Sequence, residues 1–239
     1  MATQPTKLSE RAILVHMRIS MWTGRRKDKK VTQEVCCGHG SASDAGSWWT
    51  HFVPKQDLKG IESAANYCRS TWMKQTLPWM DGGLRILPSE MLMDYSAKMR
   101  EAVAKYDHEV RLFIDRYPAI AADAEKRLGK LLDGKRMPTV REIEHKFKIH
   151  LDLFPIPEAS DFRVHLDNEE AEQIREQMTA SISTAAEKAM NDVWDRFSSL
   201  IEKVETTLAE PDKKFKNSLI SNLREFCTML PKYNLTRDN

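Results

Sequence analysis

The sequence predicts a mostly α-helical protein, an elongated helical bundle with long antiparallel helices and a small N-terminal β element. Apolar residues recur about every 3.6 residues through 89–117 and about every 3.8 through 168–209, as on one face of a helix. Over residues 13–21 apolar and polar side chains alternate instead, which is typical of a half-buried strand. At 1.5 Å per residue the two helices would be about 45 and 60 Å long, so we expect an elongated shape.

We divide the chain into two domains. Residues 1–87 form an N-terminal α+β module with a basic turn, and residues 88–239 form a long-helix bundle domain. The charges are distributed unevenly, because residues 1–60 hold ten Lys and Arg against five Asp and Glu, whereas residues 151–239 hold eleven against seventeen. An anionic partner is therefore expected at the N-terminal module.

The elements of the N-terminal module follow from local signals. The strand over 13–21 ends at Thr23-Gly24 and is followed by the basic run. Residues 31–35 could form a second strand or one short amphipathic turn of helix. The small polar residues of 38–47 predict a loop. The chain is then expected to be helical over 56–77, as far as Pro78, and briefly extended over 84–87.

Helices account for most of the second domain. Ser89 is a candidate N-cap for the helix that we expect to end at Tyr117, before Pro118, with a shorter helix over 119–133. Thr139 and Glu142 have the spacing of a capping box. An extended piece over 153–157, the long helix 168–209 and a last helix that begins near Pro211 and ends at Pro231 complete the prediction.

No catalytic or cofactor signature stands out. Cys36, Cys37, His39 and His51 are ligand types for zinc, but their spacing lacks the C-x2-C knuckle that presents two thiolates to one ion. Neither glycine-rich stretch fits a phosphate-binding loop, and the carboxylates have solvated helical spacings. We therefore predict no enzyme, no cofactor and no metal. Whether Cys36, Cys37 and His39 act beyond structure stays open.

The strongest binding signal is a basic cluster close to several tryptophans. Cations that contact phosphates, together with aromatic faces that stack on bases, are the composition of single-strand binding surfaces. The alternative is a solvated turn beside tryptophans that fill a small core. The candidate nucleic-acid-binding residues are Trp22, Arg25, Arg26, Lys27, Lys29, Lys30, Trp48 and Trp49.

Nothing in the sequence predicts a membrane or secreted protein. No run approaches the roughly 20 apolar residues that span a bilayer, and the N-terminus lacks the pattern of a signal peptide. Four cysteines, two of them adjacent, do not form a disulfide framework. We expect a reducing cytoplasm and no contact with a membrane.

Three stretches resemble a known family: "ISMWTGRRKDKK", "RSTWMKQTLPWMDGGLRILPSEMLMDY" and "KKFKNSLISNLREFCTMLPKYNL". The family comprises helical phage and mobile-element proteins of unknown function, often encoded beside MoxR-like AAA+ ATPases and von Willebrand factor A proteins. The resemblance spans most of the chain. It implies a bacterial host cytoplasm and an AAA+ ATPase partner, and it supplies no catalytic residues.

Three functional hypotheses follow. The first is a non-enzymatic helical adaptor or assembly protein of a phage or mobile element, working beside an AAA+ ATPase. The second is a nucleic-acid-binding accessory factor that prefers single strands and acts through the basic, aromatic N-terminal module. The third is an inhibitor of a host defence system. We also predict a homo-oligomer, because two long apolar stripes expose more surface than one short hairpin covers.

Overall fold

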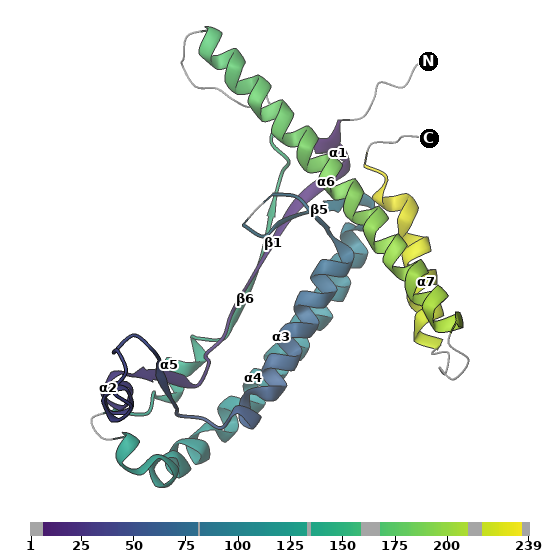
Figure 1. Cartoon of the computed structure of the whole chain (residues 1–239). Coiled ribbons are helices and arrows are strands. Elements are labelled where there is room, and N and C mark those ends of the chain that lie inside the picture. Colours follow the sequence, from purple (N-terminus) through teal and green to yellow (C-terminus); the bar gives the residue numbers. More distant parts are fainter. Residues whose placement is uncertain (1–6, 81, 133–134, 159–167, 210–216, 236–239) are drawn as a thin grey trace, which may run out of the picture. The chain divides into compact units, whose positions relative to one another are not determined.

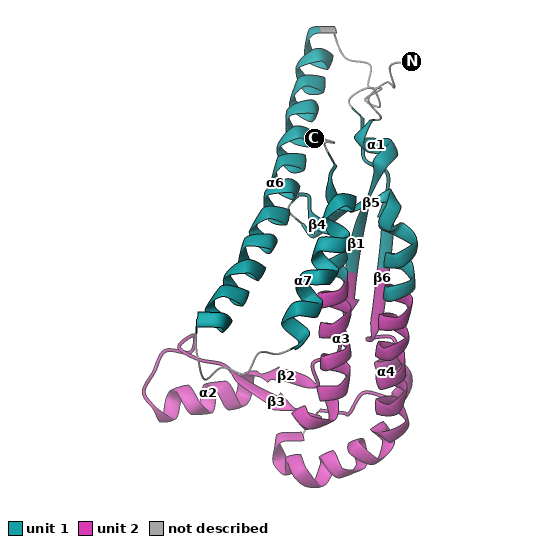
Figure 2. Ribbon diagram, turned by 90° about the vertical axis from the view of Figure 1, so that its right-hand side faces the viewer, with its two compact units in different colours: residues 1–17, 72–98, 151–239 teal, residues 18–71, 99–150 magenta. Residues whose placement is uncertain are grey.

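The computed structural model describes residues 7–80, 82–132, 135–158, 168–209 and 217–235. The chain forms two compact units that alternate along the sequence (Figure 2). Unit 1 comprises residues 1–17, 72–98 and 151–239, and unit 2 comprises 18–71 and 99–150. The predicted boundary between 1–87 and 88–239 differs from this division. The first strand pairs with residues 84–88, and the segment around residue 77 packs on the long C-terminal helix, so N-terminal residues join the C-terminal part.

The protein is mostly helical with long helices, as predicted (Figure 1). The longest are α3 (Lys55–Gln75), α4 (Leu92–Leu128) and α6 (Asn168–Ala209). Helix α7 spans Asn217–Met229, whereas the predicted start near Pro211 lies outside the described residues. None of the described helices is long and apolar enough to cross a membrane. The shorter helical elements are α1 (Leu8–Arg11), α2 (Lys29–Gly38), α5 (Val140–Glu144), η1 (Ser89–Met91), η2 (Gly129–Leu132) and η4 (Leu230–Tyr233).

A four-stranded sheet has the order β4-β5-β1-β6. Strands β1 and β5 pair antiparallel, with Ala12 opposite Pro88 and His16 opposite Leu84. These two strands confirm the strand over 13–21 and the extended piece over 84–87. The sheet is not confined to the N-terminal module, because β6 comes from the middle of the chain. The four strands are β4 (Leu77–Pro78), β5 (Leu84–Pro88), β1 (Ala12–Ser20) and β6 (Lys148–Phe154).

A separate two-stranded ribbon, β2 (Arg25–Asp28) with β3 (Trp48–His51), was not predicted. The sequence indicated a basic turn there. Gly24 precedes β2 at φ +63°, and an added Cβ would lie 2.9 Å from Leu58 Cδ1, so this turn needs glycine. Helix α2 follows β2, which confirms the helical alternative for residues 31–35.

The helix predicted to end before Pro118 continues through it. Proline removes one backbone hydrogen bond and usually ends or kinks a helix. Here the buried stripe continues past the proline, because Phe113 and Tyr117 are followed by Ala124 and Leu128. The Tyr117 hydroxyl also donates to the Pro138 carbonyl at 2.8 Å. Packing of this stripe holds α4 together as one helix, so the two helices predicted over 89–117 and 119–133 were wrong.

In unit 2, α3 and α4 lie side by side and antiparallel (Figures 1 and 2). The Lys105 ammonium lies 4.5 Å from the centre of the Tyr67 ring, and Arg116 reaches Asp57 at 3.8 Å. An aromatic cluster extends this core and includes Phe113, Tyr117, Phe147 and Trp22.

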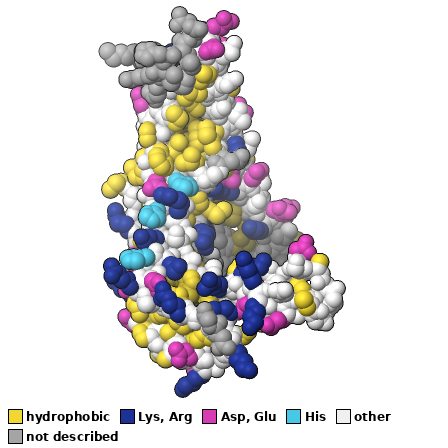
Figure 3. Space-filling model, turned by 90° about the vertical axis from the view of Figure 1, so that its left-hand side faces the viewer, with side chains coloured by type: hydrophobic (Ala, Val, Ile, Leu, Met, Phe, Trp, Pro, Cys, Tyr) yellow, Lys and Arg dark blue, Asp and Glu magenta, His cyan; other side chains and the backbone are white. Residues whose placement is uncertain are grey.

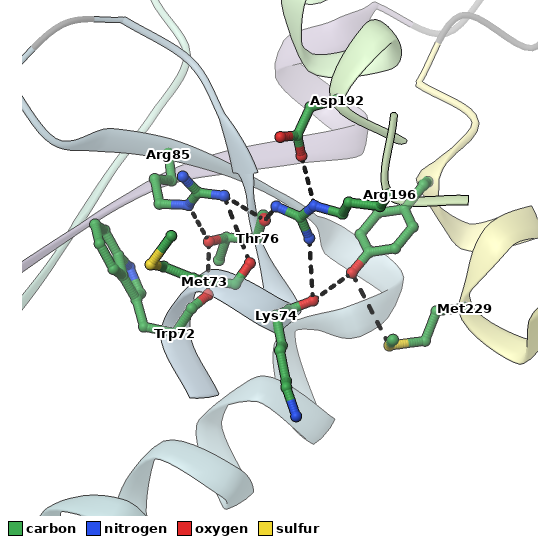
Figure 4. A network of polar contacts seen from close by, with 9 residues as sticks. Trp72, Met73, Lys74, Thr76, Arg85, Asp192, Arg196 and Met229 are labelled. Carbon is green, nitrogen blue, oxygen red and sulfur yellow. Dashed lines mark hydrogen bonds and ion pairs between the residues drawn. The ribbon is translucent and has the colours of Figure 1, made fainter. Parts of the chain in front are cut away.

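In unit 1, side chains from distant segments meet at the end of α3 (Figure 4). Arg85 donates to the Thr76 carbonyl at 2.8 Å and to its hydroxyl at 2.6 Å, and Arg196 donates to the same carbonyl at 3.0 Å. The Tyr233 hydroxyl donates to the Lys74 carbonyl at 2.8 Å. The last carbonyls of a helix have no hydrogen-bond partner within the helix, so these donors supply the partners that α3 lacks.

Candidate functional site

The β2–β3 ribbon has one outward face and one face that carries the buried side chains. Side chains alternate along a strand, and Arg25 is paired with His51 while Lys27 is paired with Trp49. These four residues therefore share one face. The opposite face carries Arg26, Asp28, Trp48 and Thr50, of which Asp28 and Thr50 are buried and Arg26 and Trp48 are exposed. The ribbon thus presents basic and aromatic groups together.

Asp28 holds the ribbon to its neighbours. Its carboxylate accepts from the Val31 amide at 3.2 Å, as an N-cap of α2, and from the Thr50 hydroxyl at 3.1 Å. It also forms an ion pair with Lys135, and this contact holds the pKa of the Asp28 carboxyl below its usual value. The only acidic side chain of β2 is therefore buried and paired, so it does not neutralise the basic residues beside it.

The five predicted basic residues are all exposed. Arg25, Arg26 and Lys27 lie on β2, while Lys29 and Lys30 begin α2. Across the described ranges, none of the five forms an ion pair with a carboxylate. Their charges are open to a partner in solution.

Two exposed tryptophans lie on β3, Trp49 on the face of Arg25 and Lys27 and Trp48 on the opposite face with Arg26. Trp48 is 45% exposed and Trp49 is 42% exposed, which is unusual for side chains with so much apolar surface. The Arg25 guanidinium lies 4.8 Å from the centre of the Trp49 ring, a cation–π contact. A cation and an aromatic face are thus held together on a paired backbone.

The surroundings of His51 show that the potential here is positive. Burial lowers the pKa of the His51 imidazole, and the charges of Lys55, Arg25 and Arg127 lower it further. Arg127 comes from the end of α4 and donates to the carbonyls of His51 and Phe52 at 2.7 and 2.9 Å. Three cations therefore disfavour a fourth positive charge, and the same field attracts anions.

A shallow cavity of about 330 Å³ extends the basic surface from Arg26 to residues near α5. Arg136 and Lys146 line it, together with Pro138 and Glu142. Arg136 makes two bonds to the Glu142 carboxylate, at 2.6 and 2.9 Å, and Glu142 belongs to the predicted capping box, which is confirmed. Lys and Arg side chains gather across the lower part of the face in Figure 3, at the height of α2 and α5 in Figure 1.

Sequence reasoning missed Lys55, Arg127, Arg136 and Lys146. Lys55 lies four residues after the end of β3, but the other three come from segments more than 70 residues after it. No local pattern marks them. Only the fold brings them to the ribbon.

Trp22 is placed differently from the other predicted site residues. Its ring centre lies 6.0 Å from that of Tyr117 and 6.5 Å from that of Phe113, and its side chain is half-buried. This geometry favours packing in the core of unit 2. A stacking role for Trp22 stays a prediction, whereas Trp48 and Trp49 are the indoles that the ribbon exposes.

The thiols and imidazoles predicted as weak metal candidates do not gather. Among the described residues, no group of three or more His, Cys, Asp or Glu side chains could hold a metal ion. Cys36 is buried, Cys37 is exposed, and both are free thiols. The chemistry that the ribbon does support is binding, since guanidinium and ammonium groups fit phosphate oxygens and indole rings stack on bases.

No protein-family model matches the chain, and no curated protein or solved structure matches it either.

Proposed function

We propose that this protein is a nucleic-acid-binding accessory factor that contacts its ligand through the β2–β3 ribbon of unit 2. One observation carries the proposal: β2, β3 and the start of α2 hold five exposed cations without carboxylate partners and two exposed indoles, with Trp49 on the face of Arg25 and Lys27. Phosphates neutralise such cations and release counterions, which supplies most of the sequence-independent affinity for nucleic acid.

The exposed tryptophans favour single strands over duplexes. Bases in a duplex are stacked on each other, whereas those of a single strand can stack on aromatic side chains. Trp49 lies directly under the Arg25 guanidinium, so one base and its phosphate could be bound by neighbouring side chains. We expect little sequence preference, because every base presents a π-face.

Fluorescence anisotropy with labelled oligonucleotides tests this proposal. Single-stranded DNA should bind at low salt, and the triple variant Arg25→Gln, Arg26→Gln, Lys27→Gln should bind at least about tenfold more weakly. A matched triple variant of exposed arginines on α3 and α4, namely Arg69→Gln, Arg100→Gln, Arg111→Gln, should bind almost as tightly as the wild type. No detectable binding of single- or double-stranded DNA or RNA at low salt would refute the proposal.

A second candidate function is that of a non-enzymatic adaptor or assembly protein. The observation that favours it is the apolar surface of α6, where Trp194 is 59% and Leu208 is 68% exposed. Origin in a phage or mobile element, a bacterial cytoplasm and an AAA+ ATPase partner rest on the family resemblance alone. Purification from a bacterial host separates the two candidates, since an absorbance excess at 260 nm favours nucleic acid and a stoichiometric protein band favours the adaptor.

The elongated bundle and the homo-oligomer are also proposals. The lengths of α4 and α6 support the first, and the exposed apolar rows of α6 support the second. Small-angle scattering tests the shape, because a radius of gyration near about 18 Å, the compact value for this length, would contradict it. A host-defence inhibitor has no specific observation in its favour among the described residues.

A further inference from the structure

Helices α6 and α7 of unit 1 pack against each other as a hairpin. The Phe197 and Phe226 rings are stacked with their centres 6.2 Å apart, and Phe226 is buried. Val204, seven residues after Phe197, and Leu223, three residues before Phe226, lie on the same sides of their helices by spacing and are half-buried. Each helix therefore buries apolar side chains against the other along one side only.

The hairpin leaves a second apolar face open. On α6, Trp194, Ile201 and Leu208 occur every seventh residue and are 59%, 41% and 68% exposed. On α7, Ile220 is 41% exposed, and the exposed Cys227 follows it by seven residues. A seven-residue repeat keeps side chains on one line when helices pack at a shallow angle, as in coiled coils and four-helix bundles.

A cavity lies at one end of this face, between α6 and the η4 turn that follows α7. It measures about 600 Å³ and is lined by Met190, Val193 and Trp194 of α6 and by Leu230 and Pro231 of η4. Its walls are mainly apolar side chains. Water is a poor occupant for such a surface, and a helical partner would cover it.

The two borders of the open face carry opposite charges. Residues three and four positions apart are neighbours on a helix, so Glu205 lies beside both Ile201 and Leu208. By the same spacing Arg224 lies beside both Ile220 and Cys227. Both are exposed, and neither forms an ion pair within the described part of the chain. Each border therefore carries one exposed charge, an acidic one on α6 and a basic one on α7.

We infer that the open face of the α6–α7 hairpin binds a second copy of this chain, so that two hairpins form a four-helix bundle. A two-fold interface brings the same face of both protomers together, and such a face must be complementary to itself. Opposite charges on the two borders meet this condition, because the Glu205 border of one protomer then lies along the Arg224 border of the other. The inference does not rest on nucleic-acid binding, which involves unit 2.

Cysteine labelling tests where the copies meet. Cys227 lies on the proposed interface, and Cys37, on α2 of unit 2, is an exposed thiol outside it. The maleimide labelling rate of Cys227 should fall as protein concentration rises, whereas the rate of Cys37 should not change. Peptide mass spectrometry reads both sites in one sample. Equal rates at all concentrations, or a monomer by sedimentation up to about 100 μM, would overturn the inference.

Substitutions on the open face should separate the copies without unfolding the chain. Ile201→Glu should weaken self-association at least about tenfold, because a charge would be buried in the interface. Leu112→Glu on α4 is the matched control, since Leu112 is 43% exposed and belongs to unit 2. Thermal melts should show both variants folded. Equal association of Ile201→Glu and the wild type would assign self-association to another surface.

Charge exchange distinguishes a second copy from a different protein. Glu205→Arg and Arg224→Glu should each weaken dimerisation, because each variant places like charges at the shared borders. The double variant should restore it, since the pairing is then reversed in both protomers. No weakening by the single changes, or no recovery in the double variant, would contradict the two-fold arrangement.

Discussion

Two arginine clusters of this protein differ in what surrounds them. In unit 1, Arg85 and Arg196 converge on the end of α3, where carbonyls accept their hydrogen bonds and the Asp192 carboxylate forms an ion pair with Arg196 (Figure 4). In unit 2, Arg25 and Arg26 extend from β2 with no carboxylate partner among the described residues. The same side chain therefore stabilises the fold in one place and is available to a ligand in the other.

The surroundings of the unit 1 cluster explain how its two cations lie close together. Burial lowers the pKa of the Arg85 guanidinium, with a smaller effect from the charge of Arg196, yet arginine stays charged at neutral pH. Two nearby cations are tolerated because the ends of peptide dipoles and Asp192 face them. At the ribbon the acid of β2, Asp28, already forms an ion pair with Lys135, so it does not compensate the charges of Arg25 and Arg26.

The largest expected effect comes from Asp28→Ala. The change removes the N-cap of α2 and leaves the Lys135 ammonium half-buried without its partner. Loss of a cap costs about 1 kcal/mol and breaking a buried pair costs about 3–5 kcal/mol; because the Lys135 side chain is 20% exposed, we expect the low end of the sum, about 4 kcal/mol. Urea denaturation measures it. A loss below about 1 kcal/mol would show that Asp28 does not hold the ribbon.

Acid should have the same effect on this pair. The folded-state pKa of Asp28 is lowered, so its contribution to stability is present above about pH 3.9 and is lost as the pH falls through the folded-state pKa.

Arg85→Met should give the next largest loss. It leaves the Thr76 carbonyl and hydroxyl with fewer donors and removes the cation–π contact with Trp72. We expect about 2–3 kcal/mol in the free energy of unfolding. The control Arg111→Met on the exposed face of α4 should change stability by less than about 0.5 kcal/mol. Nucleic-acid affinity should not change with either variant, which separates the two clusters.

Replacement by alanine should mainly affect stability at Trp22 and mainly affect nucleic-acid binding at Trp49. Trp22→Ala removes packing against Phe113 and Tyr117, so it should lower stability by about 2 kcal/mol and leave binding to the folded protein nearly unchanged. Trp49→Ala should weaken single-strand binding by about 1–3 kcal/mol with little loss of stability. One melt and one titration per variant suffice. Lost binding in Trp22→Ala at full stability would place Trp22 in the site.

The smallest effect concerns His51. Its pKa in the folded state is lowered from 6.5, so the folded protein binds fewer protons than the unfolded chain just below that pH. Stability should therefore decrease as the pH falls through 6.5. A bound phosphate would offset the surrounding cations and raise this pKa, which an NMR titration with and without oligonucleotide can follow. A free-state pKa above 6.5 would contradict the positive potential.

Much of the fold could be predicted from sequence because long helices repeat one local pattern many times. The stripe of residues 89–117 and the capping box at Thr139 are examples. The ribbon could not be predicted, since β2 and β3 are four residues each and their pairing depends on contacts some 20 residues apart. At Pro118 the local signal was strong, but packing of Tyr117 and Ala124 outweighed it.

The candidate site was predictable only in part for the same reason. A run of basic residues is visible in any sequence, but whether acids neutralise it depends on the fold. Asp28 stands within the run and would be expected to weaken it, yet its side chain is buried. Arg127 reaches the ribbon from the far end of α4, a contact that no local spacing indicates.

The salt dependence of single-strand binding tests the central claim, that the ribbon cations are free to bind phosphates, most directly. The slope of log K against log salt should be shallower by about 2 in the Arg25, Arg26, Lys27 triple variant, because each phosphate contact contributes about 0.7 on single strands. The matched Arg69, Arg100, Arg111 variant should keep the wild-type slope. Equal slopes in the wild type and both variants would contradict the account.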